Sequence, residues 1–383
     1  MDLQLSSTAL KVAEAMASGK RVYVEQALQY LVEKGGSDLH LSAGSSPLVR
    51  LHGALMPIPG TPELTAEDTQ EVLDSFLTDP EKTEEFRVDN EVDFSFELSD
   101  VARFRVNAYR QRGSVSMVLR AIPFTIRTIG ELDIPPVVQT LAEEERGLIL
   151  VTGATGSGKS TTLASMIDHI NSTMSKHIVT IEDPIEFLYS NKKSIISQRE
   201  VGVDTSSFTR ALRRVLRQDP DVILIGEIRD QETMETALSA AETGHLVLST
   251  LHTLNASETI SRIISLFPPH AQTQARFQLA GTLKGVIAQR LVPSSDGNTR
   301  VPVVEALVST GRVRDLILEP SRPEDLNRII HEGEYYGMQT FDQSLIARVN
   351  QGLISMDEAL KVASNPSDMK LQAGAQPTTV PGV

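Results

Sequence analysis

One eight-residue segment, Gly153–Ser160, has the residue types and spacing needed to hold a phosphate chain. It reads Gly-Ala-Thr-Gly-Ser-Gly-Lys-Ser and matches the phosphate-binding-loop (P-loop) pattern at every position. Glycines let backbone N–H groups turn toward phosphate oxygens, and a following helix adds the positive end of its dipole. We expect Lys159 to reach the β- and γ-phosphates and the Ser160 hydroxyl to bind Mg²⁺, within a nucleotide site made of Gly153, Ala154, Thr155, Gly156, Ser157, Gly158, Lys159, Ser160 and Thr161. The alternative, a Gly- and Ser-rich turn with a chance lysine, is disfavoured because an apolar run precedes the loop and a helical pattern follows it.

Carboxylates follow two other apolar runs. The stretch 221–227 is apolar between Asp221 and Glu227, and an acid at the end of such a strand is the Walker B arrangement that supports Mg²⁺. The alternative is an acidic strand end that caps a helix. A second cluster, Glu182, Asp183 and Glu186, follows the run 177–181. Residue types alone leave catalysis and an ordinary solvated loop equally open for this cluster.

Two histidines, His245 and His252, flank the apolar run 246–250. A lone histidine beside a strand is more often structural than functional. From residue types alone both are therefore weak candidates for catalysis.

The P-loop, the carboxylates and the two histidines all lie beside short apolar runs. There are four such runs, and helical patterns separate them. Such runs are typical of parallel strands covered on both faces. We therefore predict an α/β nucleotide-binding core at residues 137–290, with strands at 148–152, 177–181, 222–225 and 246–250.

The remaining chain divides by composition and period. Residues 1–122 predict an α+β domain with a helix at 22–34, a hairpin region at 38–55, a helix capped by Thr65, and strands at 92–98, 103–109 and 115–120. Three prolines between 123 and 136 predict an interdomain linker. Residues 291–364 are expected to form a helical subdomain, and residues 365–383, rich in Pro, Gly, Thr and Ala, a flexible tail.

Composition excludes several classes of protein. The chain has 383 residues, a net charge of −14 and no cysteine. The negative charge disfavours binding to nucleic acid. The absence of cysteine excludes disulfides, thiolate zinc sites and cysteine nucleophiles. No apolar run is long enough to span a membrane and no signal-peptide pattern begins the chain, so we expect a cytoplasmic protein.

Four blocks in fixed order resemble the secretion-superfamily ATPases that drive type II secretion and type IV pili. They are the P-loop, the acidic box 181–187, the Walker B run to Asp230, and the histidine box 241–253. Gly36-Ser37-Asp38-Leu39-His40-Leu41 and Gly337-Met338-Gln339-Thr340-Phe341-Asp342 resemble the pilus-retraction branch of PilT and PilU. The resemblance implies a PAS-like N-terminal domain, a RecA-like ATPase core, ATP and Mg²⁺ as cofactors, and a homohexamer.

The resemblance also implies roles for individual residues. Glu186 matches the residue that polarises the attacking water, Glu182 and Asp183 support the metal shell, and Glu227 is the Walker B acid. His245 and His252 match the histidines that link the γ-phosphate to the next subunit. The family's N-terminal arginines, which a neighbouring subunit supplies to the active site, match Arg105 and Arg120, with Arg110 and Arg112 as further candidates; pattern alone suggests a solvated strand face for Arg105 and Arg120.

Two departures refine the resemblance. Extension and type II secretion ATPases carry a four-cysteine zinc module, which this chain cannot have. PilT carries an Ala-Ile-Arg-Asn-Leu-Ile-Arg-Glu segment, whereas this chain has Arg312 and Leu318 at the variable positions, a pattern more similar to PilU. The implied partners are a PilT-like ATPase and a PilC-like platform protein at the cytoplasmic face of the inner membrane. An accessory subunit that couples to PilT, an assembly ATPase and a RecA-like helicase remain the alternatives.

Overall fold

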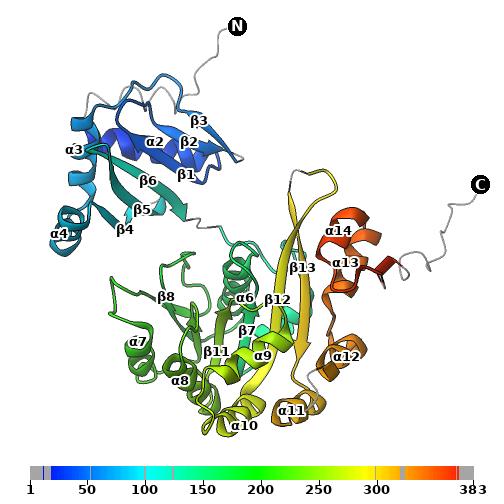
Figure 1. Cartoon of the computed structure of the whole chain (residues 1–383). Coiled ribbons are helices and arrows are strands. Elements are labelled where there is room, and N and C mark those ends of the chain that lie inside the picture. The colour runs from blue at the N-terminus through cyan, green and yellow to red at the C-terminus, as the bar shows by residue number, and fades with distance from the viewer. Residues whose placement is uncertain are drawn as a thin grey trace, which may run out of the picture. The chain divides into compact units, whose positions relative to one another are not determined.

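The computed structural model describes residues 12, 19–51, 53–98, 101–122, 125–297, 299–319, 324–367 and 369–370. The chain divides into unit 1, residues 1–124, and unit 2, residues 125–383 (Figure 1). No helix among the described residues is both long and apolar enough to cross a membrane.

Unit 1 is a six-stranded antiparallel sheet with helices packed on one face. The strand order is β3-β2-β1-β6-β5-β4. Its elements are α2 (Lys20–Glu33), β1 (Asp38–Ser42), β2 (Leu48–Leu51), β3 (Ala54–Pro57), α3 (Ala66–Phe76), α4 (Pro80–Asp89), β4 (Glu91–Leu98), β5 (Ala102–Gln111) and β6 (Ser114–Ile122).

Alternation along the strands decides which face of this sheet is buried. Phe104, Val106 and Ala108 of β5 are buried, and the residues between them are at least partly exposed. Thr65 caps α3 in a capping box with Asp68, in which each residue's side chain accepts the other's backbone N–H. The predicted helices, the hairpin region and the three predicted strands of unit 1 are confirmed.

Unit 2 is a seven-stranded sheet between two helical layers. Its strand order is β13-β12-β7-β11-β10-β8-β9, and all pairs are parallel except β12 with β13. The strands are β7 (Gly147–Thr152), β8 (His177–Glu182), β9 (Ile195–Glu200), β10 (Val222–Ile225), β11 (Leu246–Leu251), β12 (Leu283–Pro293) and β13 (Arg300–Val308). The helices are α5 (Val137–Ala142), α6 (Lys159–Thr173), α7 (Phe208–Val215), α8 (Gln231–Glu242), α9 (Ala256–Ser265), α10 (Gln272–Thr282), α11 (Gly311–Leu318), α12 (Glu324–Glu332), the 3₁₀ turn η2 (Glu334–Tyr336), α13 (Phe341–Asn350) and α14 (Met356–Val362).

The central strands of unit 2 contribute apolar side chains to the cores on both faces of the sheet. Leu148 and Leu150 of β7 face the core beneath α7, α8, α9 and α10, while Ile149 and Val151 face the core beneath α5 and α6. This explains why the central strands are continuously apolar rather than alternating. The four predicted strands and the mixed α/β fold are confirmed.

Three segments differ from the expectations drawn from the sequence. Residues 291–308, expected to lie in a helical region, include the end of β12 and all of β13, and both strands belong to the core sheet. In the expected linker, Ile129, Leu132 and Ile134 are buried in the core of unit 2. In the expected tail, Met369 is buried against α13 and α14, and residues 371–383 lie outside the described part of the chain.

Candidate nucleotide and catalytic site

The loop between β7 and α6 has backbone conformations that require glycine. Gly153, Gly156 and Gly158 have positive φ angles of 142°, 78° and 92°. A Cβ atom on Gly153 would lie 2.4 Å from the carbonyl oxygen of Gln289, and one on Gly158 would lie 2.7 Å from the Gln289 Nε2. The sequence therefore uses glycine here for both conformation and space.

Lys159 lies inside this loop. Its Nζ donates hydrogen bonds to the carbonyl oxygens of Gly153 (2.9 Å) and Ala154 (3.0 Å). Burial lowers the pKa of Lys159, and the nearby Glu227 partly offsets this effect. The Oγ atoms of Thr152 and Ser157 are buried without a hydrogen-bond partner among the described residues. The loop thus holds an ammonium group and unsatisfied hydroxyls, a donor set that suits phosphate oxygens.

Gln289 of β12 packs against Gly153 and Gly158 of the loop. The sequence patterns did not identify this residue. Its side chain is buried, and its Oε1 accepts a hydrogen bond from Thr162 Oγ1 of α6 at 2.7 Å. The only signal in the sequence is a glutamine directly after the apolar run Val286–Ala288.

Strand register brings the Walker B acid and one histidine to the P-loop edge of the sheet. Leu251 of β11 pairs with Thr152 of β7, and Ile225 of β10 pairs with Ser249 of β11. Glu227 therefore follows β10 at the same edge at which the P-loop leaves β7. Its side chain is only 14% exposed and forms an ion pair with Arg229. His252 Nε2 lies 3.4 Å from the other carboxylate oxygen, so these groups form one cluster.

His245 lies elsewhere. It precedes β11, whose first residue pairs with Gly147 at the start of β7. His245 and His252 therefore lie at opposite ends of β11, and only His252 is at the end where the P-loop begins. The six residues of β11 between them span roughly 20 Å. His245 Nδ1 instead lies 2.9 Å from the Ala240 carbonyl oxygen. Within one chain, His245 is therefore too distant from the P-loop to contact the nucleotide bound there, and its role toward the next subunit stays a prediction.

The acidic box separates into one buried and two exposed carboxylates. Glu182 is buried and accepts hydrogen bonds from Thr180 Oγ1 (2.7 Å), Gln198 Nε2 (3.3 Å) and the Glu186 backbone N (3.3 Å). Burial raises the pKa of Glu182, and this effect exceeds the opposing effect of the hydrogen bonds, which lower it. Asp183 and Glu186 are exposed at the end of β8. Glu182 thus anchors the loop that presents Glu186, while its own oxygens are occupied.

The arginines Arg105 and Arg120 are neighbours in unit 1. They face each other across β5 and β6, and Arg120 also faces Asp38 of β1. Arg120 Nε donates to Asp38 Oδ1 at 2.8 Å, while the Arg120 side chain remains 65% exposed. Burial opposes ionisation of Asp38, but hydrogen bonds from Ser37 and Arg120 outweigh it and lower its pKa.

The further arginine candidates lie at the β5–β6 turn. Arg110 donates to the Gly113 carbonyl oxygen at 3.3 Å and stacks over Phe86. Arg112 is exposed, with a positive φ of 51°. They are thus removed along the strands from the pair Arg105 and Arg120.

The described residues fit Mg²⁺ only together with a nucleotide. No group of three or more histidines and carboxylates among them could hold a metal ion alone. Mg²⁺ commonly takes one or two protein ligands and completes its shell with substrate phosphates and water. Ser160, exposed in the first turn of α6, and Glu227 have the oxygen donors that such a shell requires.

Comparisons with known proteins agree with this arrangement. The family model described as "Type II/IV secretion system protein" matches residues 16–361. The chain is 47% identical to a twitching motility protein of Neisseria gonorrhoeae, over 85% of this chain and 86% of that protein. It is 43% identical to the type IV pilus ATPase PilU of Pseudomonas aeruginosa, over 91% and 90% of the two chains.

A solved structure gives the same result for the fold. The pilus retraction motor PilT with bound ADP superposes with a TM-score of 0.83 and 46% identity, and the match covers 91% of this chain and 99% of PilT. Together these matches cover both units of the chain. The chain therefore belongs to the type II/IV secretion family and, within it, to the group of twitching-motility ATPases that includes PilT and PilU.

Proposed function

We propose that this ATPase is a homohexameric motor that hydrolyses ATP with Mg²⁺ to power retraction of type IV pili. The observation that carries the proposal is the cluster of Lys159, Glu227 and His252 at one edge of a parallel sheet. Such a cluster can bind a triphosphate, hold its metal ion and contact the γ-phosphate. In this proposal unit 2 is a RecA-like core and unit 1 a PAS-like domain.

Each group has a distinct task in the proposed reaction. Lys159 and the loop N–H groups bind the β- and γ-phosphates, and Ser160 and Glu227 hold Mg²⁺, which neutralises charge on the phosphates. Glu186, exposed on the loop anchored by Glu182, orients the attacking water. Arg105 and Arg120 of a neighbouring subunit stabilise charge on the transferred phosphoryl group. The active site is therefore incomplete in a single chain.

Dependence on assembly tests this proposal. Turnover per subunit should fall steeply when the protein is diluted below the concentration at which it assembles, because each site needs arginines from a second copy. A steady-state ATPase assay beside sedimentation at the same concentrations measures both quantities. A turnover per subunit that stays constant through dissociation contradicts shared sites.

The proposed setting is the cytoplasmic face of the inner membrane, beside a PilT-like ATPase and a PilC-like platform protein.

The second candidate function is that of a PilT-dependent motor of the PilU type or an accessory subunit with little motor activity of its own. Arg312 and Leu318, which depart from the PilT segment, both lie on α11 and favour the PilU type. Pilus retraction measured without PilT, and then with an ATPase-dead PilT, separates these roles: retraction only in the second case indicates a dependent motor.

A further inference from the structure

Helix α7 carries an arginine-lined groove that the proposed reaction does not use. The groove has a volume of about 740 Å³ and is lined by Ser207, Thr209, Arg210, Arg213, Arg214, Arg217 and Glu232. A second hollow of about 660 Å³ shares Arg210 and Arg214 and adds Arg199. We refer to the five arginines Arg199, Arg210, Arg213, Arg214 and Arg217 as the arginine groove.

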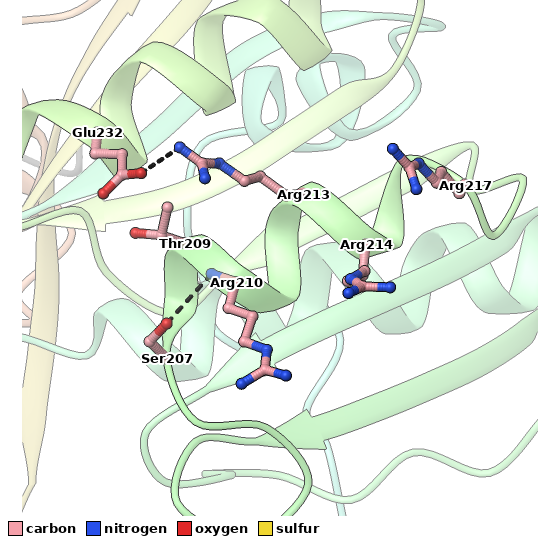
Figure 2. Close-up of a pocket in the computed structure, with 7 residues that line it drawn as sticks. All are labelled: Ser207, Thr209, Arg210, Arg213, Arg214, Arg217 and Glu232. Carbon is pink, nitrogen blue, oxygen red and sulfur yellow. Dashed lines mark hydrogen bonds and ion pairs between the residues drawn. The ribbon is translucent and has the colours of Figure 1, made fainter.

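The sequence of α7 places its three arginines, Arg210, Arg213 and Arg214, outward. Ala211, Leu212 and Val215 are buried beneath the helix, so the positions between them face away from the core. Figure 2 shows the side chains of Arg210, Arg214 and Arg217 projecting from α7 and the segment after it, away from Glu232. The fold therefore holds several guanidinium groups close together on one side of unit 2.

The positive charge of the arginine groove is poorly balanced within the chain. Arg213 forms an ion pair with Glu232. Arg210 donates to Ser206 Oγ, and Arg199 donates to the Asp204 carbonyl oxygen. Arg214 and Arg217 form no ion pair with any described residue. A surface of this kind attracts an anionic partner.

The chemistry of the lining and of the whole chain narrows the choice of partner. The lining is almost entirely polar or charged, which does not suit the apolar ligands that most pockets bind. The net charge of −14 opposes association with nucleic acid. The same charge shows that carboxylates are plentiful on this chain, so a second copy can supply the missing anion.

Helix α4 has the properties of such a partner. Residues 63–97 contain thirteen Asp or Glu residues and two Lys or Arg residues. Glu81, Glu84, Glu85 and Val88 recur at helical spacing on the side of α4 opposite Phe86, which is its one buried residue. Val88 is 61% exposed there. Glu84 and Glu85 form ion pairs with Arg87 and Lys82 of the same helix. The four acidic residues of α4 outnumber its two basic ones, so the helix keeps a net negative charge that a cationic surface can contact.

We propose that the arginine groove of one copy receives the acidic face of α4, formed by Glu81, Glu84 and Glu85, from a second copy. The inference rests on the proposed homohexamer and names the surfaces that build it. The two surfaces are different, so the contact is head-to-tail and can close into a ring. Groove-to-groove and helix-to-helix pairing would bring like charges together and are therefore disfavoured, which fixes the order of contacts.

Charge reversal in two variants tests the contact. The groove variant is Arg214→Glu with Arg217→Glu, chosen because neither arginine forms an ion pair with a described residue. The helix variant is Glu81→Lys with Glu84→Lys. Each should raise the concentration at half-assembly by about tenfold or more, because like charges then face each other. The matched control, Lys193→Glu with Lys361→Glu, changes exposed charges elsewhere and should assemble as the wild type does.

Mixing the two variants distinguishes a contact between copies from one within a chain. In an equimolar mixture each reversed groove can meet a reversed helix, so sedimentation should show assembly restored to near the wild-type level. No restoration, wild-type assembly of either variant, or a wild-type chain that never self-associates overturns the proposal. Circular dichroism and thermal melting confirm that each variant is folded. Assembly is read without ATP turnover, so a wild-type chain that assembles but does not hydrolyse ATP contradicts the proposed function and leaves the groove contact supported.

Discussion

Arg105 lies directly opposite Arg120 across β5 and β6, on the exposed face of the unit 1 sheet. Like charges in directly opposed positions destabilise a sheet. Asp38 of β1 lies opposite Arg120 on its other side and forms ion pairs with both Arg120 and Arg50. One carboxylate cannot neutralise three guanidinium groups, so the region around Arg105 and Arg120 keeps a positive charge.

The first prediction concerns sharing of active sites. Arg105→Ala or Arg120→Ala should lower turnover of the assembled protein by about 10²- to 10³-fold, because transition-state charge loses its partner. Mixing either variant with Lys159→Ala should recover part of the activity. In mixed assemblies an intact P-loop can meet intact arginines from the neighbour. A steady-state ATPase assay measures this recovery.

Lys34→Ala in unit 1 serves as the control for this experiment and should leave turnover unchanged. A mixture no more active than its separate components would show that the arginines act within their own chain or outside the reaction.

The second prediction separates binding from chemistry. Lys159→Ala should abolish ATP binding, because the ammonium group inside the loop is lost. Glu186→Ala should abolish turnover while nucleotide affinity changes less than threefold, because the group that orients water does not hold the phosphates. Titration calorimetry and a turnover assay distinguish the two. Wild-type turnover in Lys159→Ala is incompatible with a P-loop mechanism.

The third prediction follows from the opposite positions of the two histidines. His252→Ala should lower turnover of the assembled protein about tenfold or more, since His252 lies beside Glu227. His245→Ala should leave the affinity of an unassembled chain for nucleotide unchanged, because His245 is at the far edge of the sheet. Nucleotide binding measured below the assembly concentration checks this second part. A loss of nucleotide affinity in unassembled His245→Ala contradicts this assignment.

The fourth prediction uses the lowered pKa of Asp38. A carboxyl whose pKa is lower in the folded state stabilises the fold above its unfolded pKa of about 3.9, and this contribution is lost as the pH falls below that value. Asp38→Asn should therefore cost about 1 kcal/mol of unfolding free energy at pH 7, with the exposure of Arg120 limiting the effect. The difference from wild type should shrink at pH 3. Urea unfolding at both pH values measures it, and a difference independent of pH would exclude the ionised pair as its cause.

The fifth prediction concerns Gln289. Gln289→Ala should cost about 1–3 kcal/mol of unfolding free energy, because Thr162 Oγ1 loses its acceptor in a buried site. Affinity for nucleotide should fall as well, since the side chain packs against Gly158 of the loop. Gln274→Ala, at an exposed position of α10, is the control. Denaturant unfolding and nucleotide titration read the two effects separately.

Much of the fold could be predicted from residue patterns, because central strands are continuously apolar and half-buried strands alternate. The edges of the unit 2 sheet could not. Strand β9 has only two apolar residues, both at its start, and β12 follows α10 without a turn residue and carries Gln289 and Arg290. Pro135 and Pro136 favour a linker by residue type, but in the structure they immediately precede α5.

The candidate site was predictable where one short segment fixes the geometry, as in Gly153–Ser160. The site was harder to predict where the residues that contact each other come from elements far apart in the sequence. Gln289 is 127 residues from Thr162, and no local pattern joins them. The resemblance groups His245 and His252 in one histidine box, but the strand between them separates the two side chains by its whole length.

The strands β12 and β13 link the P-loop to the C-terminal helices. Gln289 of β12 packs against the loop, while α13 and α14 pack on the same two strands through Phe341, Leu345 and Ala359. The Ser344 hydroxyl of α13 also accepts a hydrogen bond from the backbone N of Val304 in β13. A load borne by the C-terminal helices would therefore pass to the phosphate-binding loop through a hydrogen-bonded pair of strands rather than through a hinge.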